Sequence, residues 1–166
     1  MIMKELSKES IISFLNKFSD RVVSAPNGYL IHMLGAKCID CSIEEHWIDF
    51  EVVMPEEGVN PIRSMHGGYL AAIADHIMCS SALAFINDTG VTVTTIDLQL
   101  NPIKALYPGD KVILRCTAQH LGKRTSLMSC RFYRDGELCA IASENLTKLP
   151  LGTVSFIDYD SLGSTK

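Results

Sequence analysis

The sequence lacks long hydrophobic runs and has few cysteines, and both deficits exclude whole classes of protein. No stretch of about 18 uncharged apolar residues occurs, so we expect no membrane-spanning segment. The first residues do not pass from a basic region into an apolar one, so we expect no secretory signal. The chain is therefore expected to be soluble and cytoplasmic, with six reduced thiols. Two of them form a Cys38-x-x-Cys41 pair without a second such pair, which favours ordinary strand residues over a metal or redox motif.

The composition is that of one folded domain with an uneven distribution of charge. Its 166 residues are 47% hydrophobic and 20% charged, which permits a sizeable core. A net charge of −4 argues against a general nucleic-acid binder. Residues 101–148 nevertheless hold 8 basic and 4 acidic side chains. This segment could hold a small polyanionic ligand, or it could be a solvated face of a sheet.

The apolar pattern predicts a helix at the N-terminus and a set of strands in the second half. A helical stripe follows Ser7, which is a plausible N-cap, and Ala25-Pro26-Asn27-Gly28 breaks it. Strands are expected at 47–53, 91–101, 111–121 and 126–148, the last split by a hairpin turn at 134–137. We therefore expect a helical extension (1–25), a core domain (26–149) and a loosely packed tail (150–166).

A long apolar helix lies between these segments. After Gly68 about 18 residues run without glycine or proline, which predicts a helix of roughly 27 Å. Its apolar residues fall on every face, so we expect it to be buried on all sides. One such helix followed by antiparallel strands predicts an α+β fold in which the sheet curls around the helix.

Asp75 and His76 stand in this helix without any other acidic or basic residue. A buried carboxylate must be paired, hydrogen-bonded or protonated, so Asp75 is either a polar contact to a neighbouring subunit or a catalytic acid, base or nucleophile. His76 points about 100° away around the helix and is better explained as a structural or interface histidine.

His66-Gly67-Gly68 marks the start of the helix. Glycine lets a ligand approach the backbone, and the first N–H groups of a helix are unpaired at the positive end of its dipole. Such a start can bind an anion or stabilise an oxyanion, although two glycines can also simply form a tight entry turn.

The combined pattern resembles the PaaI-type hotdog-fold acyl-CoA thioesterases over roughly residues 28–148. It comprises Asn60-x5-His66-Gly67-Gly68-x6-Asp75, then Thr94-x-Ile-Asp97-Leu, then Pro108-Gly109-Asp110. The resemblance implies a hotdog fold, an antiparallel sheet wrapped around a long central helix, assembling as dimers.

The resemblance also implies roles for individual residues. Gly67 would donate its N–H to the thioester carbonyl, and Asp75 of the opposite subunit would be the catalytic carboxylate. Asn60 would orient the water or the carboxylate, and His66 would support its loop. The implied substrate-binding residues are Gly68, Cys79, Thr95, Lys123, Arg124 and Thr125.

The resemblance also covers one binding loop, and the sequence departs from the family at two places. The turn at 122–125 resembles the loop that contacts the nucleotide end of CoA. Cys79 stands where some relatives carry a threonine, which leaves a hydroxyl role unfilled or moved to Ser80. The order of residues at 100–105 also departs from the commoner pattern, so the shape of the acyl pocket does not transfer.

The implied function is hydrolysis of acyl- or aryl-CoA to the free acid and CoA, with Asp75 as general base or nucleophile. No metal cluster, phosphate loop or Ser-His-Asp order is visible, so no metal or cofactor is expected. The expected partner is acyl-CoA, with no nucleic acid and no membrane, in a homodimer or homotetramer. Two alternatives stay open, a non-catalytic acyl-CoA binding protein and an acyl-thioester dehydratase or hydratase.

Overall fold

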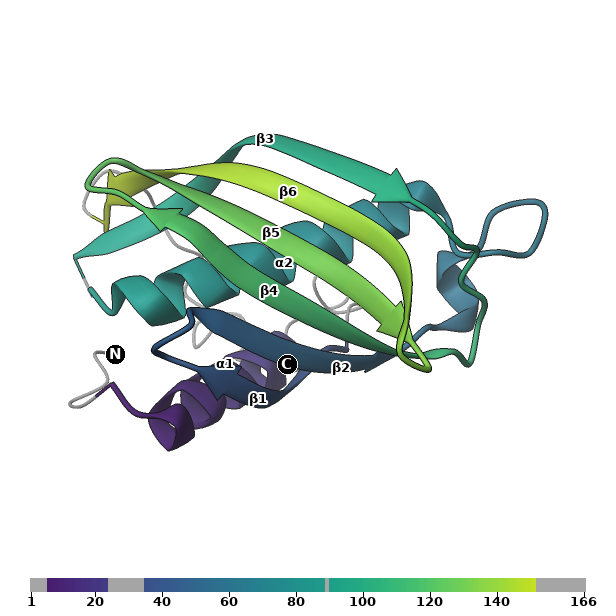
Figure 1. Cartoon of the computed structure of the whole chain (residues 1–166), viewed down its shortest axis with the longest axis horizontal. Coiled ribbons are helices and arrows are strands. Elements are labelled where there is room, and N and C mark those ends of the chain that lie inside the picture. The colour runs from purple at the N-terminus through teal and green to yellow at the C-terminus, as the bar shows by residue number, and fades with distance from the viewer. Residues whose placement is uncertain (1–5, 24–34, 89, 152–166) are drawn as a thin grey trace, which may run out of the picture.

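The protein consists of a six-stranded antiparallel sheet and two helices. A computed structural model describes residues 6–23, 35–88 and 90–151. The elements are α1 (Lys8–Val23), β1 (Lys37–Ser42), β2 (Trp47–Val53), a 3₁₀ turn (Glu56–Gly58), α2 (Gly67–Ile86), β3 (Val91–Pro102), β4 (Lys111–Leu121), β5 (Thr125–Arg134) and β6 (Glu137–Pro150). The strand order is β1-β2-β4-β5-β6-β3, and every neighbouring pair is antiparallel (Figure 1).

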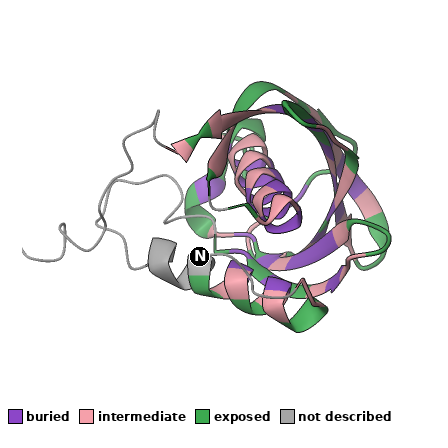
Figure 2. Cartoon of the chain, turned by 90° about the vertical axis from the view of Figure 1, so that its left-hand side faces the viewer, coloured by how far each residue is buried: buried purple, intermediate pink, exposed green. Residues whose placement is uncertain are grey.

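The sheet curls around α2, as the end view of Figure 2 shows. The inward positions of the strands alternate with outward ones, and the inward ones on β4, β5 and β6 are mostly apolar and fully buried. The predicted α+β hotdog architecture is therefore confirmed. The strand limits expected at 47–53 and 111–121 and the turn at 134–137 are confirmed as well.

The central helix has defined ends. His66 is its N-cap, and the backbone of Asn87 adopts the left-handed conformation (φ 45°) that ends the helix. By length and composition, α2 is the one helix in the described part of the chain that could cross a membrane, but 61% of that window is buried inside the protein. This burial identifies it as the core helix.

The prediction that α2 is buried on all sides was correct for most, but not all, of its surface. A stripe at helical spacing is half-buried within one chain: Ala72, Asp75, His76, Cys79, Leu83 and Ile86. This stripe includes Asp75 and lies on the side of α2 that contacts β3, which is one of the two edge strands of the sheet. One face of the core is thus left incompletely covered by a single chain.

The N-terminal helix α1 packs on the opposite edge of the sheet (Figure 1). Ser7 caps it as predicted, because its hydroxyl accepts a hydrogen bond from the Ser10 N–H at 3.1 Å. Asn16 fixes α1 to β1 by donating to the Cys38 carbonyl at 3.0 Å and accepting from the Cys38 N–H at 2.8 Å. The predicted break at 25–28 lies outside the described residues, and so does the predicted tail (150–166) beyond residue 151.

Cys38 and Cys41 are residues of strand β1, as their sequence context predicts. The pairing with β2 shifts register between Cys38 and Asp40, so both thiols lie buried although they are three positions apart in the strand. Burial raises the pKa of Cys38 to about 12. The pair therefore has neither the exposure nor the acidity of a redox motif.

Candidate active site

The start of α2 presents a free backbone donor. His66 Nδ1 accepts the Gly68 N–H at 2.9 Å, which satisfies one of the unpaired donors of the first turn. The N–H of Gly67 has no acceptor among the described residues, and a Cβ built at Gly67 would meet no atom within 4 Å. His66, Gly67 and Gly68 are all exposed. The structure therefore places these three predicted residues together and leaves the Gly67 N–H open to a ligand.

Two backbone hydrogen bonds hold the approach to this helix start. The Met65 N–H donates to the Leu106 carbonyl and the His66 N–H to the Gly58 carbonyl, both at 2.7 Å. Gly58 is required at its position, because a Cβ there would lie 2.9 Å from the ring of Tyr69. The orientation of the Gly67 N–H thus depends on the segments around Gly58 and Leu106.

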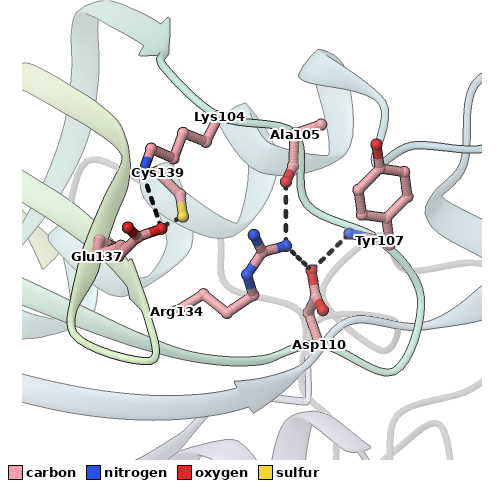
Figure 3. Close-up of polar contacts among 7 residues, drawn as sticks. All are labelled: Lys104, Ala105, Tyr107, Asp110, Arg134, Glu137 and Cys139. Carbon is pink, nitrogen blue, oxygen red and sulfur yellow. Dashed lines mark hydrogen bonds and ion pairs between the residues drawn. The ribbon is translucent and has the colours of Figure 1, made fainter.

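The segment around Leu106 is in turn fixed by Asp110, the acid of the Pro-Gly-Asp motif (Figure 3). Asp110 Oδ2 accepts the Tyr107 N–H at 2.8 Å and Arg134 Nη1 at 2.8 Å. Arg134 also donates to the Ala105 carbonyl at 3.2 Å. This motif therefore has a structural role, since it holds the loop on which the helix start rests.

Asn60 uses its side chain within its own loop. Its Oδ1 accepts the N–H groups of Ile62 and Ser64, both at 3.1 Å, and its Nδ2 donates to the Ser64 hydroxyl at 2.8 Å. All its side-chain hydrogen bonds in the described part of the chain lie in this 60–64 turn. Its predicted role in orienting the water or the carboxylate stays a prediction.

Asp75 lies in a compact polar cluster between α2 and the sheet. The Thr95 hydroxyl on β3 lies 2.6 Å from Asp75 Oδ1 and 2.6 Å from Glu144 Oε1 on β6. Cys79, one turn after Asp75, has its Sγ 3.9 Å from the Thr95 hydroxyl and 3.7 Å from Glu144 Oε1. The structure thus brings together three predicted site residues and adds a second carboxyl.

Burial sets the protonation of this cluster. It raises the pKa of Glu144 to about 8, and the neighbouring Asp75 carboxylate raises it further, while the contacts with Thr95 and Cys79 oppose the increase. Burial also raises the pKa of the Cys79 thiol far above its usual range and lowers the pKa of His76 to about 4. At neutral pH, Cys79 is a thiol and His76 is neutral, so neither is a charged catalytic group.

The hydroxyl role that Cys79 leaves unfilled does not move to Ser80. The Ser80 hydroxyl is buried and donates to the His76 carbonyl at 2.8 Å within the helix. The hydroxyl beside Asp75 belongs instead to Thr95.

The donor atoms of Asp75, Cys79 and Glu144 lie within 4.8 Å of one another, a spacing at which three ligands could reach one metal ion. The Thr95 hydroxyl, however, lies between the two carboxyls at 2.6 Å from each. The arrangement therefore fits a hydrogen-bonded cluster.

Glu144 is not among the residues predicted for the site, although the sequence carries a signal for it. On β6 the side chains of Ala140, Ala142 and Leu146 point inward and are fully buried. Glu144 is in phase with them and has a relative exposure of 0%. A carboxyl at an inward position of a strand must be paired or protonated, as at Asp75.

The helix start and the carboxyl cluster are separate within one chain. Gly67 and Asp75 are eight positions apart on α2, which corresponds to roughly 12 Å along the helix. An oxyanion donor and an attacking group must each lie about 3 Å from the reacting carbonyl. One chain therefore does not bring the Gly67 N–H and the Asp75 carboxylate to the same thioester.

The basic turn Lys123-Arg124-Thr125 lies at the far end of the sheet from the start of α2 (Figure 1). The Gly122 N–H donates to the Thr125 carbonyl and the Lys148 N–H to the Arg124 carbonyl, both at 2.9 Å. The side chains of Lys123 and Arg124 are exposed and make no ion pair with the described residues. The turn is thus rigid in its backbone, with both cations available.

Comparison with known proteins agrees with this fold. The family described as the Thioesterase superfamily matches residues 63–141, which include the helix start, Asp75 and Thr95. A curated relative from Archaeoglobus fulgidus, named as an esterase, is 28% identical over 100 residues. The match spans 60% of this chain and 61% of that protein's length.

Solved structures share the architecture at low sequence identity. The thioesterase HI1161 of Haemophilus influenzae superposes with a TM-score of 0.71 at 21% identity, over 91% of this chain and 96% of that one. The E. coli PaaI protein gives 0.65 at 16% identity, over 83% and 96%. Smu.793 of Streptococcus mutans, bound to acetyl CoA, gives 0.62 at 17% identity, over 70% and 90%.

These findings confirm the resemblance drawn from the motifs. The chain has the hotdog fold, and its residues 63–141 are similar to the Thioesterase superfamily.

Proposed function

We propose that this protein is an acyl-CoA thioesterase that hydrolyses acyl- or aryl-CoA to the free acid and CoA. The observation that carries the proposal is that one helix presents two suitable groups. These are an unpaired N–H at Gly67 and an oriented, half-buried carboxyl at Asp75. The Gly67 N–H polarises the thioester carbonyl and stabilises the oxyanion. Asp75 activates a water as general base, or attacks the carbonyl itself as nucleophile.

The working enzyme is a homodimer, alone or paired into a homotetramer. The separation of Gly67 from Asp75 requires the two groups at one site to come from different chains. A second copy also accounts for the half-buried stripe of α2 and for β3, an edge strand 12 residues long with Ile96 exposed. A two-fold axis beside β3 would place the helix start of one chain near the Asp75 of the other, giving two equal sites.

Lys123 and Arg124 bind the nucleotide end of CoA. The support is their exposure without ion-pair partners in the described chain and their place in the basic segment 101–148. Arginine matches phosphate geometry with a fork of donors, and lysine adds a mobile charge. The acetyl CoA bound to the S. mutans relative supports the same class of ligand. Binding requires neither nucleic acid nor a membrane, and we propose that the protein works in the cytoplasm without a cofactor.

Replacing both Lys123 and Arg124 by Ala should raise KM for acyl-CoA several-fold and leave kcat nearly unchanged. The reason is that the lost contacts act equally on the bound substrate and the transition state. Steady-state kinetics at low and high salt test this, because the difference should shrink when salt screens the wild type. A truncated thioester without the nucleotide is the control, and both proteins should hydrolyse it equally. Equal KM values for acyl-CoA at low salt would remove the turn from the site.

A panel of acyl-CoA substrates tests the function itself. The purified full chain is incubated with short, long and aromatic acyl-CoA, and release of CoA is followed with a thiol-reactive dye against a substrate-free control for the protein's own cysteines. Release of CoA establishes hydrolysis. Binding without release indicates an acyl-CoA binding protein. Conversion of a 3-hydroxyacyl-CoA to its enoyl form without release indicates a dehydratase.

A further inference from the structure

The Thr95 hydroxyl makes two short contacts that one proton cannot serve. Its oxygen lies 2.6 Å from Asp75 Oδ1 and 2.6 Å from Glu144 Oε1. A hydroxyl carries a single hydrogen, and an ionised carboxylate can only accept. If both carboxyls were ionised, one of these contacts would join two oxygen atoms with no hydrogen between them. The cluster therefore holds one further proton, on one of its two carboxyls.

Burial decides which carboxyl holds it. Glu144 has a relative exposure of 0%, whereas Asp75 is half-buried. Glu144 Oε2 is buried and has no hydrogen-bond partner among the described residues. An ionised carboxylate with an unpaired buried oxygen is far more costly than a neutral carboxyl in the same place. The proton therefore belongs to Glu144.

We propose that Glu144 is a positioning residue for the hydrolysis: as a neutral acid it donates to the Thr95 hydroxyl, which donates to Asp75 and holds that carboxylate ionised and in one orientation. Glu144 acts through Thr95 and does not touch the substrate. The inference rests on the proposed function for its effect on rate. The location of the proton depends on the geometry of the cluster alone.

The surroundings of Glu144 support this assignment. The titratable groups that face it are Asp75 and Cys79 of α2, and its neighbours across the sheet are Leu98 on β3 and Met128 on β5. With no cation among these residues to stabilise its charge, the pKa of Glu144 is raised from 4.5 to about 8. At neutral pH the side chain is therefore mostly a neutral acid.

The same shift fixes how stability depends on pH. A carboxyl whose folded-state pKa is raised binds more protons when folded than when unfolded between pH 4.5 and about 8. Its contribution to the free energy of unfolding is therefore full below pH 4.5 and is lost as the pH rises through 8. Glu144→Gln removes this contribution, so the stability of the variant relative to wild type should increase from about pH 5 to about pH 8.

Two variants separate the proton donor from the packing. Glutamine at 144 supplies an N–H to Thr95 at every pH, whereas Glu144→Leu fills similar space without a donor. At pH 7, kcat/KM for acyl-CoA should stay near wild type in Glu144→Gln and fall by about tenfold or more in Glu144→Leu, which loses a hydrogen-bond chain to a charged group. The wild type should also lose activity above about pH 8, and Glu144→Gln should not. Equal losses in both variants, or the same alkaline loss in Glu144→Gln, would overturn the proposal.

Infrared spectroscopy tests the proton without any need for activity. The wild type at neutral pH should show the C=O band of a buried protonated carboxyl, which disappears on Glu144→Gln and fades as the pH passes about 8. If this band is present while no acyl-CoA is hydrolysed, the proposed function fails and the proton assignment stands. If the band does not change on substitution, the proton is not on Glu144. Binding of Zn²⁺ by wild type but not by Glu144→Gln would also overturn the assignment, because a metal site would then explain the cluster.

Discussion

Replacing Asp75 by Asn should lower kcat/KM for acyl-CoA by at least about 10², the usual size of a general-base contribution. The amide is nearly the same size as the carboxylate, and its oxygen can still accept from the Thr95 hydroxyl, which contacts Asp75 at 2.6 Å. The variant should therefore fold, with the same unfolding midpoint to within a few degrees. It loses the basic oxygen that activates water or attacks the carbonyl, whichever of the two routes operates.

Asp88→Asn is the matched control for the loss of one negative charge. Asp88 is exposed just after α2, and its Oδ1 accepts the Gly90 N–H at 2.8 Å, a contact that an Asn can also make. Its kinetics should equal those of the wild type. Hydrolysis at the wild-type rate by a folded Asp75→Asn protein would show that this carboxyl is not catalytic.

Replacing Gly67 by Pro should remove the oxyanion donor without breaking the helix. Gly67 is the first residue of α2, a position where proline is favoured because its missing N–H is not needed there. His66 already has the extended backbone (φ −67°, ψ 136°) that a residue before proline requires. The helix, and with it the fold, should therefore survive the substitution.

Gly67→Ala is the reference for this variant. Both substitutions add a Cβ where no described atom lies within 4 Å, but alanine keeps the N–H and proline deletes it. The proline variant should have a kcat about 10² to 10³ lower than the alanine variant, the typical effect of losing one oxyanion donor. Single-turnover measurements on both would show this difference. Equal rates would mean that the Gly67 N–H does not stabilise the reacting carbonyl.

Most of the fold followed from local patterns, because each element has its own signal. The alternation in 47–53 and 111–121, the Asp135-Gly136 turn and the apolar run after Gly68 predict elements that the structure contains. The predicted complete burial of α2 was wrong along one stripe. Composition shows that every face of the helix is apolar, but it does not tell whether a given face is covered by the same chain or by a second one.

The candidate site was predictable in part. His66, Gly67 and Asp75 follow from a helix start and from a carboxylate in an apolar helix. Glu144 was overlooked because it lies 69 positions from Asp75 in the sequence, and the contact exists only once β6 pairs with β3. Pairing of distant strands is what brings it within reach of Thr95.

The central claim is that each site takes Gly67 from one chain and Asp75 from the other. Chains carrying Gly67→Pro and Asp75→Asn, each with its own affinity tag, can be co-expressed and purified through both tags in turn. Such a heterodimer has one site with both defects and one intact site, so it should have about half the activity of a wild-type dimer. Each variant expressed alone should be nearly inactive. An inactive heterodimer, or none recovered although both chains fold, would contradict a site shared between two chains.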